Sequence, residues 1–326
     1  MSSPRKVVLL GPQQPLYDVG SAIEELGITG TVAIVRAGYH EREPDDAELV
    51  TALGVPTVNL GLHARGVEVF RDDAEFGTAY HARQQRLRHM QSFYRTRLDK
   101  TEEAAKQISL RYVEPELLAQ EEKVSVDQLR YLDADHLERC RAVRALFDDA
   151  WPPASRPLIA KHRAEIRTIL DGASALVIAG GHVASLLNRL QLFDVPGAAF
   201  DKPIIAWGAG AMVLTERVIL FHDYPPYGSD IAQILDAGFG LAPGYVVLPD
   251  PRRRINFDAS AGIQRFARRM APSTCVAMDH GARLVFEEGQ LIHARGARLT
   301  TTGHVEREWT GEPSRFSTPY MDTVHV

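Results

Sequence analysis

The amino-acid sequence predicts an α/β fold in which a doubly wound, mostly parallel sheet carries a helical insertion. Two observations indicate the sheet. Short runs are apolar on both faces, as buried parallel strands are, and segments with helical spacing separate them. A third observation indicates the insertion, because the stretch from 65 to 153 contains no strand-like run.

Residues 1–64 form the first part of the α/β domain. They are expected to fold as strand 7–10, helix 18–26, strand 31–35, helix 45–53 and strand 56–60. Gly11 ends the first strand and Gly54 closes the second helix, since glycine suits sharp turns and helix ends. Strands that alternate with helices at this spacing are typical of a parallel sheet.

Residues 65–153 form the helical insertion. Its clearest helix has an apolar stripe made of Phe76, Tyr80, Leu87, Met90, Tyr94 and Leu98. Pro115 and Pro152 separate further helices, one of them at 133–147. The insertion is either a cap that packs on the edge of the sheet or an arm for dimerisation or partner binding. Acidic residues balance its arginines, which favours a solvated surface over a polyanion site.

Residues 154–310 form the second part of the α/β domain, and residues 311–326 form a polar tail that is loose or docked. The expected elements are helix 158–170, strand 175–179, helix 183–190, strand 203–206 and short strands at 245–248, 275–278, 283–286 and 291–294. The last two strands are expected to form a hairpin around Glu287-Glu288-Gly289-Gln290.

The composition narrows the functional classes. A net charge of -5 and a pI near 6.2 give no support for binding to nucleic acid or to anionic membranes. The apolar run at 7–10 is too short for a signal-peptide core or a membrane span. Cys140 and Cys275 lie far apart and form no metal-ligand spacing, so we expect a reduced, cytoplasmic protein and a core role for Cys275.

Two glycine turns form the candidate binding site. Gly180-Gly181 and Gly208-Ala209-Gly210-Ala211 each follow a strand and open a helix. Helix N-termini present unpaired N–H groups that favour anions, and small residues let a ligand approach the backbone. The turn after the first strand, Gly11-Pro12-Gln13-Gln14-Pro15, lacks the dinucleotide-binding pattern, so no cofactor is expected.

The segment from 203 to 212 has the shape of a nucleophile elbow, in which a sharp turn between a strand and a helix lifts one side chain above the sheet. The position that would carry the nucleophile is Gly208, which has no side chain. No neighbouring residue offers a replacement hydroxyl or thiol.

The sequence resembles the peptidase E and cyanophycinase family of serine peptidases, whose fold is like that of class I glutamine amidotransferases. The matching segments are 178–187, Trp207-Gly208-Ala209-Gly210-Ala211, 240–243 and 277–285. The resemblance implies the same fold over about 157–294 and an oxyanion hole near the 180–183 turn. The helical insertion lies outside it.

The resemblance also assigns candidate site residues. The family's serine falls on Gly208, and its histidine would fall within 247–251, where the chain has none. The acid of peptidase E falls near Asp223 and the cyanophycinase acid on His280. The catalytic candidates are therefore Asp223 and His280, and the ligand-binding candidates are Gly180, Gly181, His182, Gly208 and Ala209.

The side chains of Asp223, His280 and His182 could also have purely structural roles. Asp223 could instead cap a turn, His280 could be a packed or surface residue, and His182 could be a local helix cap. No metal is predicted, because His182, His222 and His280 have no local ligand spacing.

The sequence favours a catalytically degenerate protein that binds a small acidic molecule or peptide, or serves as a scaffold or partner subunit. It would act as a homodimer or with a partner through the insertion. The alternative is an active hydrolase of the peptidase or amidase type, in which Asp223, His222 or His280 activates water as a general base.

Overall fold

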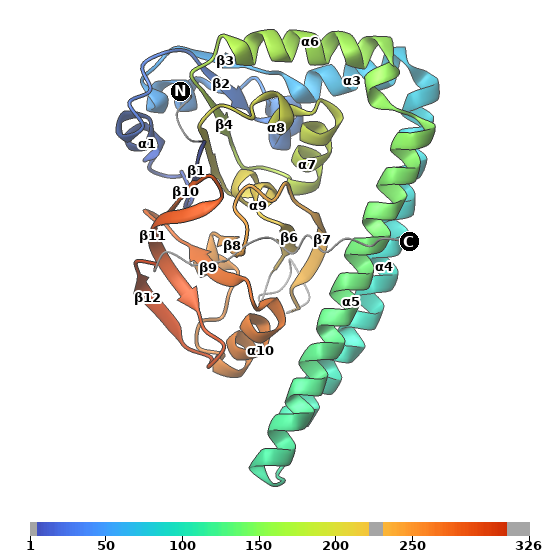
Figure 1. The fold of residues 1–326 in the computed structure, drawn as a ribbon, viewed down its shortest axis with the longest axis vertical. Helices are drawn as coiled ribbons and strands as arrows, with labels where there is room; N and C mark the ends of the chain where they lie inside the picture. Colours follow the sequence, from blue (N-terminus) through green and yellow to red (C-terminus); the bar gives the residue numbers. More distant parts are fainter. Residues whose placement is uncertain (1–4, 222–230, 312–326) are drawn as a thin grey trace.

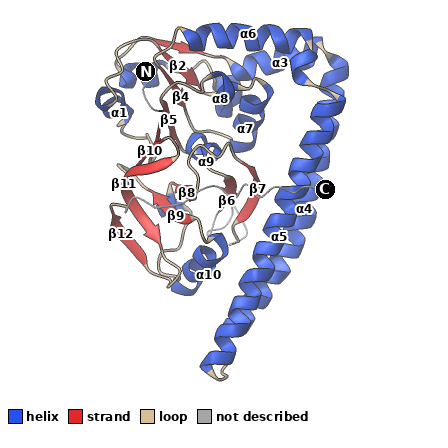
Figure 2. Cartoon of the chain, viewed as in Figure 1, coloured by secondary structure: helices blue, strands red, loops and turns tan. Residues whose placement is uncertain are grey.

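The structure is a computed structural model in which residues 5–221 and 231–311 are described (Figures 1 and 2). Its α/β class agrees with the prediction. Strands and helices alternate in one half of the body, further strands continue the sheet, and a long helical hairpin stands beside both (Figure 1).

Five parallel strands form one part of the ten-stranded sheet in the described chain. In sheet order they are β3 (Thr57–Asn59), β2 (Val32–Val35), β4 (Ala175–Ile178), β5 (Ile204–Trp207) and β1 (Lys6–Leu10). Every residue of β2, β4 and β5 is buried, which explains their uniformly apolar sequences. The predicted strands are confirmed to within one residue at each end.

The sheet continues beyond β1 through strands that are mostly antiparallel. They are β10 (Arg283–Glu287), β11 (Gln290–Leu299), β9 (Thr274–Met278), β8 (Tyr245–Pro249) and β12 (Val305–Trp309), which pairs with β11. The predicted hairpin is confirmed. Glu287 faces Gln290 in the register, and Glu288 and Gly289 between them both have positive φ.

Three strands were missed. The strand β12 has an almost wholly polar sequence, and β6 (Arg217–Leu220) and β7 (Gln233–Ala237) form a separate two-stranded sheet. The two strands of this second sheet are short and are separated by residues 221–232. No local sequence pattern predicts that these two strands pair.

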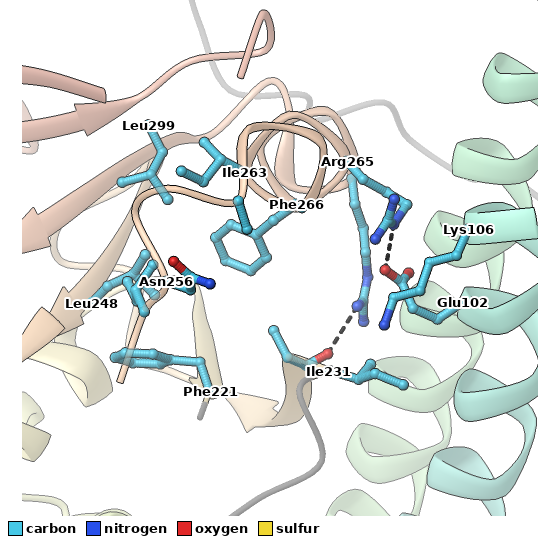
Figure 3. A pocket seen from close by; sticks show the side chains of 15 residues that line it. Glu102, Lys106, Phe221, Ile231, Leu248, Asn256, Ile263, Arg265, Phe266 and Leu299 are labelled. Atoms are coloured by element: carbon cyan, nitrogen blue, oxygen red, sulfur yellow. Dashed lines mark hydrogen bonds and ion pairs between the residues drawn. The ribbon is translucent and has the colours of Figure 1, made fainter. Parts of the chain in front are cut away.

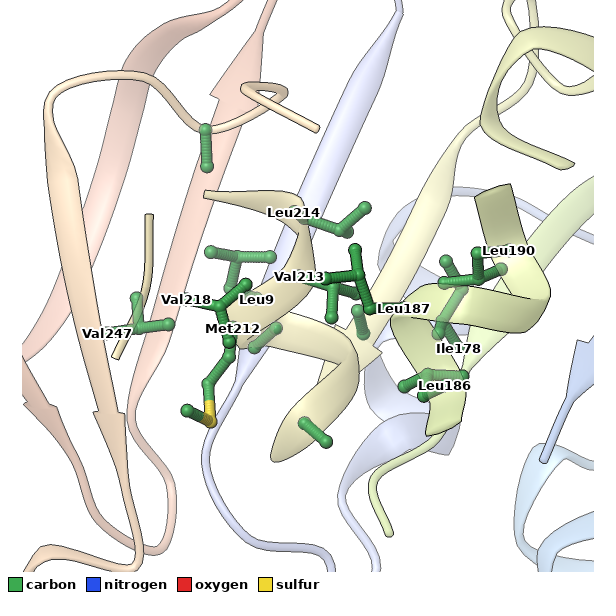
Figure 4. Close-up of a cluster of buried hydrophobic side chains, with 14 of the residues drawn as sticks. Leu9, Ile178, Leu186, Leu187, Leu190, Met212, Val213, Leu214, Val218 and Val247 are labelled. Atoms are coloured by element: carbon green, nitrogen blue, oxygen red, sulfur yellow. The ribbon is translucent and has the colours of Figure 1, made fainter. Parts of the chain in front are cut away.

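Helices cover both faces of the parallel strands. They are α1 (Val19–Glu25), α2 (Ala47–Leu53), α3 (Leu62–Asp72), α6 (Pro157–Asp171), α7 (Val183–Leu192), α8 (Val195–Ala198) and α9 (Ala209–Leu214), and α10 (Ser260–Met270) packs farther along. Val8 of β1 belongs to the core under α1 and α2, whereas Leu9 belongs to the core under α7 and α9 (Figure 4). This alternation confirms the doubly wound arrangement.

The insertion is a hairpin of two 36-residue helices, α4 (Ala74–Ser109) and α5 (Pro115–Ala150). Each is about 54 Å long at 1.5 Å per residue. Most of the predicted stripe is buried, including Tyr94 and Leu98, whereas Leu87 is half-buried. The hairpin runs alongside β7 and α10 (Figure 2). Pro115 begins α5, and the predicted helix 133–147 is part of it.

A buried polar network fixes the hairpin to the body. The Arg269 guanidinium of α10 donates to both Asp133 oxygens of α5, at 2.7 and 2.6 Å, and to the Tyr94 hydroxyl of α4 at 3.0 Å. Tyr94 donates to Asp133 and accepts the Ile234 N–H of β7. This network thus joins four elements, α10, α5, α4 and β7.

Candidate functional site

A cavity of about 1270 Å³ lies at the carboxyl ends of the parallel strands. The turns after β1, β2, β4 and β5 line it, together with the start of α2 and the segment after β8. The strands β2 and β4 are neighbours in the sheet. The chain continues from β2 to β3 on one side and from β4 to β5 on the other side, so the loops that follow β2 and β4 run in opposite directions. Such a divergence opens a crevice where ligands of doubly wound proteins bind.

Gly208 forms a sharp turn between β5 and α9 on the wall of this cavity. Its backbone angles are φ 57° and ψ -127°, a region that side chains disfavour. A Cβ added there would meet the Gly180 Cα at 3.3 Å, a tight but isolated contact. The turn therefore has the strained strand-to-helix geometry expected of an elbow.

The turn after β4 packs directly against the turn after β2. Gly181 has φ 101°, and a Cβ on it would lie 2.5 Å from the Gly38 carbonyl carbon. The His182 N–H donates to the Gly38 carbonyl at 2.7 Å. These glycines are needed because the two backbones approach too closely for a side chain. Gly180 lies beside Gly208 in the cavity wall, because the strands that precede them, β4 and β5, are paired neighbours in the sheet.

Charged side chains line the cavity on two sides. The cations are Arg36, Arg42, Arg253 and Arg254, and the carboxylates are Asp45, Glu48 and Asp250. Arg42 pairs with Asp45 at 3.4 Å. The Arg36 guanidinium lies 4.7 Å from the centre of the Tyr39 ring, and burial raises the pKa of that phenol, which keeps it a hydrogen-bond donor.

The structure brings most of the predicted glycine-turn residues together. Gly180, Gly181, Gly208 and Ala209 all line the cavity. His182 does not line it, and its Nδ1 accepts the Ser185 N–H at 3.2 Å as the N-cap of α7.

The other predicted side chains lie apart from this group. His280 is exposed, with its Nε2 3.0 Å from the carbonyl oxygen of Gln14, a residue that itself lines the cavity. Asp223 and His222 lie outside the described residues. Cys275 is fully buried, and burial raises the pKa of its thiol to about 12, as suits a core residue.

Several lining residues were not predicted from the sequence. Asp250 lies in the 247–251 stretch and has a positive φ of 54°, and it is followed by the run Arg252-Arg253-Arg254. An arginine run directly after a buried strand was an available signal. Arg36 and Arg42 had none, since their position depends on how the loop after β2 folds back.

Three histidines also gather outside the cavity lining. The His40 Nε2 lies 2.8 Å from the Ser185 hydroxyl oxygen, and the His40 ring lies 5.5 Å from that of His182 and 5.6 Å from that of His63. His40 itself has φ 55° and ψ -125°, almost the angles of Gly208. Among the described residues, no group of three or more side chains is arranged to hold a metal ion.

Stability should fall in mild acid because of two of these histidines, His182 and His63. Burial lowers the pKa of His182 and His63 from 6.5, with contributions from His40 to the first and from Arg189 to the second. The unfolded chain then binds protons first, so stability is full above about pH 6.5 and declines as the pH falls through the lowered values. Urea unfolding between pH 7.5 and 5 should show this decline.

The variant His182→Asn separates the effect of protonating His182 from its effect as the N-cap of α7. Asparagine keeps an N-cap for α7, so stability at pH 7.5 should hold while the acid decline becomes shallower. His182→Ala should give the same shallower decline but be about 1 kcal/mol less stable than His182→Asn at every pH. An unchanged pH profile in both variants would exclude His182 as a source of the effect.

The similarity of this chain to known proteins is found in its fold and not in its sequence. No protein-family model matches the sequence, and no curated protein matches it at a significant level. Solved structures that resemble it include a peptidase from an acI-B1 Actinobacterium, with 11% identity over 93% of this chain and 97% of that one and a TM-score of 0.46. They also include a peptidase E candidate from Listeria monocytogenes EGD-e, with 10% identity over 91% of this chain and 100% of that one and a TM-score of 0.43. Neither likeness tells what this chain binds or does.

Within the described residues, no helix is both long and apolar enough to cross a membrane.

Proposed function

We propose that this chain is a catalytically degenerate relative of the peptidase E and cyanophycinase family that binds a small acidic molecule or peptide in the cavity beside Gly208. The single observation that carries the proposal is Gly208 itself. It holds an elbow conformation in the wall of a large cavity and has no atom that could attack a substrate.

The lining of the cavity supports a ligand of this kind. Arg253 and Arg254 come from the segment after β8 and line the same cavity as the glycine turns, and each can donate to a carboxylate. Asp45, Glu48 and Asp250 offer partners for an amino group, as in a short peptide. The glycine turns leave room for the ligand to approach the backbone.

Wild-type protein and Gly208→Ser should both fail to hydrolyse aspartyl dipeptides and β-aspartyl-arginine. The restored hydroxyl has no histidine beside it among the described residues that line the cavity. The variant should still fold, because His40 shows that this chain holds a side chain at the same backbone angles. We expect a loss of about 1–3 kcal/mol in the free energy of unfolding.

Gly27→Ser is the control for placing a serine at a positive-φ glycine outside the cavity lining. Gly27 also has positive φ, at 64°, and nothing lies within 4 Å of an added Cβ. Calorimetry with an unhydrolysed aspartyl dipeptide measures binding in the same samples. Hydrolysis of a dipeptide by the wild type would contradict the proposal. Absence of dipeptide binding would exclude small acidic peptides as the ligand of this cavity.

A second function is favoured by one observation. Asp250 lines the same cavity as Gly208, in the stretch where the resemblance would put a histidine. As a general base it could activate water over the glycine turns, in place of Asp223, His222 or His280. If the wild type hydrolyses a substrate, Asp250→Asn should abolish that activity.

We also propose that the α4–α5 hairpin joins two copies of this chain. Its outer face exposes Phe93 and Leu146, which line one groove with Met90 and Val143. Apolar side chains make up most of the groove lining, with Arg86 and Arg139 among them, and such a face between two helices suits the same hairpin of a second copy. Light scattering after size exclusion should give a dimer mass, and a monomer at micromolar concentration would contradict this assembly.

A further inference from the structure

A nucleophile with a histidine beside it lies outside both cavities. Among the described residues, no histidine, serine, threonine or cysteine lines the cavity beside Gly208 or the smaller one, of about 300 Å³, between α10 and α4 (Figure 3). Elsewhere the Cys140 Sγ lies 3.6 Å from the His136 Nε2, and the Ser185 Oγ lies 2.8 Å from the His40 Nε2. Both pairs have the spacing of a nucleophile and its base.

The two pairs differ in how well a reagent can reach them. Cys140 and His136 are only 2% and 3% exposed, and burial raises the pKa of the Cys140 thiol to about 12. Such a thiol stays protonated and inert. Ser185 and His40 are both half-buried. The Ser185 hydroxyl is therefore the nucleophile that a small molecule can meet.

Backbone contacts hold Ser185 and His40 together. Ser185 lies in the first turn of α7, and His40 lies in the short helical segment after β2. Between them, the His182 N–H donates to the Gly38 carbonyl at 2.7 Å. A Cβ on Gly38 would lie 2.6 Å from the carbonyl oxygen of the turn after β4, so the two turns are in direct contact. The distance between the hydroxyl and the imidazole is thus set by the backbone.

Two imidazoles flank the Ser185 hydroxyl. The His182 Nδ1 lies 3.0 Å from the Oγ, but it already accepts the Ser185 N–H at 3.2 Å as the N-cap of α7. The His40 Nε2 lies closer, at 2.8 Å, and is left to accept the hydroxyl proton. A serine hydroxyl is a weak nucleophile until an adjacent base takes its proton, and His40 is in place to do so.

His40 is fixed in a strained conformation by its neighbours. Its angles, φ 55° and ψ -125°, lie in a region that side chains disfavour, and strain of this kind concentrates at functional positions. Its ring stacks on the His63 ring at 5.6 Å, with 25° between the planes. The His63 Nε2 lies 3.8 Å from the Glu41 carboxylate, and the His63 N–H donates to Glu43. A third group therefore orients the base.

We propose that Ser185 is a nucleophile that accepts an acyl group from a small activated ester, with His40 as its base. The Ser185 Oγ attacks the ester carbonyl while the His40 Nε2 takes the hydroxyl proton. A bond forms between the Oγ and the acyl carbon, the bond from that carbon to the alcohol oxygen breaks, and His40 returns the proton to the leaving alcohol. Water then attacks the acyl-serine in the same way and releases the acid. The inference goes beyond the ligand proposed for the cavity beside Gly208 and does not depend on it.

The reaction of the full chain with p-nitrophenyl acetate tests the proposal. Nitrophenol release should be about a hundredfold or more faster with the wild type than with Ser185→Ala, and mass spectrometry of quenched samples should place the acetyl group on Ser185. Ser155→Ala is the control, because the Ser155 hydroxyl donates to the Pro152 carbonyl, and this variant should react like the wild type. Ser185→Ala should keep the dipeptide affinity of the wild type, so the two proposals fail separately. Equal release by the wild type and Ser185→Ala, or acetyl groups found only at other residues, would overturn the proposal.

Variants of the two histidines identify the base. His40→Gln should slow nitrophenol release about a hundredfold, because an amide cannot take the proton, whereas His182→Asn, which keeps the cap, should slow it by less than about threefold. His40→Gly should be as slow as His40→Gln but should leave the Tm unchanged or raise it, because glycine adopts these backbone angles without strain. Circular dichroism checks that each variant folds. Unchanged release in a folded His40→Gln, or a loss confined to His182→Asn, would refute His40 as the base.

Discussion

Replacing Arg269 with methionine is expected to lower the free energy of unfolding by about 3–5 kcal/mol, because it leaves the Asp133 carboxylate buried without its partner. Both side chains are almost fully buried, at 3% and 5% exposure. The same change removes donors to Tyr94 and to the Ala232 carbonyl. The effect should appear in urea unfolding followed by circular dichroism.

Arg268→Met is the control one residue away. Arg268 pairs with Glu122 at 3.1 Å, but its side chain is 38% exposed, so its loss should cost about 0–1 kcal/mol. The double variant Asp133→Leu with Arg269→Met should be less destabilised than the sum of the two single changes, since neither then leaves an unpaired charge. If Arg269→Met cost no more than Arg268→Met, the network would not hold the hairpin.

The second large effect concerns ligand binding. Arg254→Met should weaken the binding of an aspartyl dipeptide by about ten- to a hundredfold, the range expected for a lost hydrogen bond to a charged group. Arg254 is half-buried in the cavity wall, with its guanidinium 5.6 Å from the centre of the Phe221 ring. Calorimetry at fixed ionic strength measures the change directly.

Arg252→Met provides the matched control within the same arginine run. Arg252 does not line the cavity and pairs instead with Asp279, and its side chain is 80% exposed. Its replacement should leave the dipeptide affinity within twofold of the wild type. A similar loss in both variants would point to a general loss of positive charge at this surface, and an unchanged affinity in Arg254→Met would remove that residue from the site.

The features of the fold that could be predicted from the sequence are the local ones. The parallel strands, the helix that contains Tyr94 and the 287–290 hairpin all follow from periodicity and turn residues, and each is confirmed. It failed for β6, β7 and β12 because a strand needs a partner, and the partners of these strands are fixed by tertiary packing.

Some residues of the candidate site could likewise be predicted from the sequence, and others could not. The glycine turns could be found from the sequence, since a sharp turn and a close backbone contact demand glycine at Gly181 and Gly208. Arg36 and Arg42 could not be assigned, because they reach the cavity only when the loop after β2 folds back over the end of the sheet.

By itself, the sequence determined the α/β class, the parallel strands, the helical insertion and the absence of a side chain at Gly208, since these depend on residue type and local spacing. Only the tertiary structure decided which loops line the cavity beside Gly208 and that Arg269 ties the hairpin to the body. Those features depend on contacts between residues up to 175 positions apart, and the free energy of such contacts exists only in the folded chain.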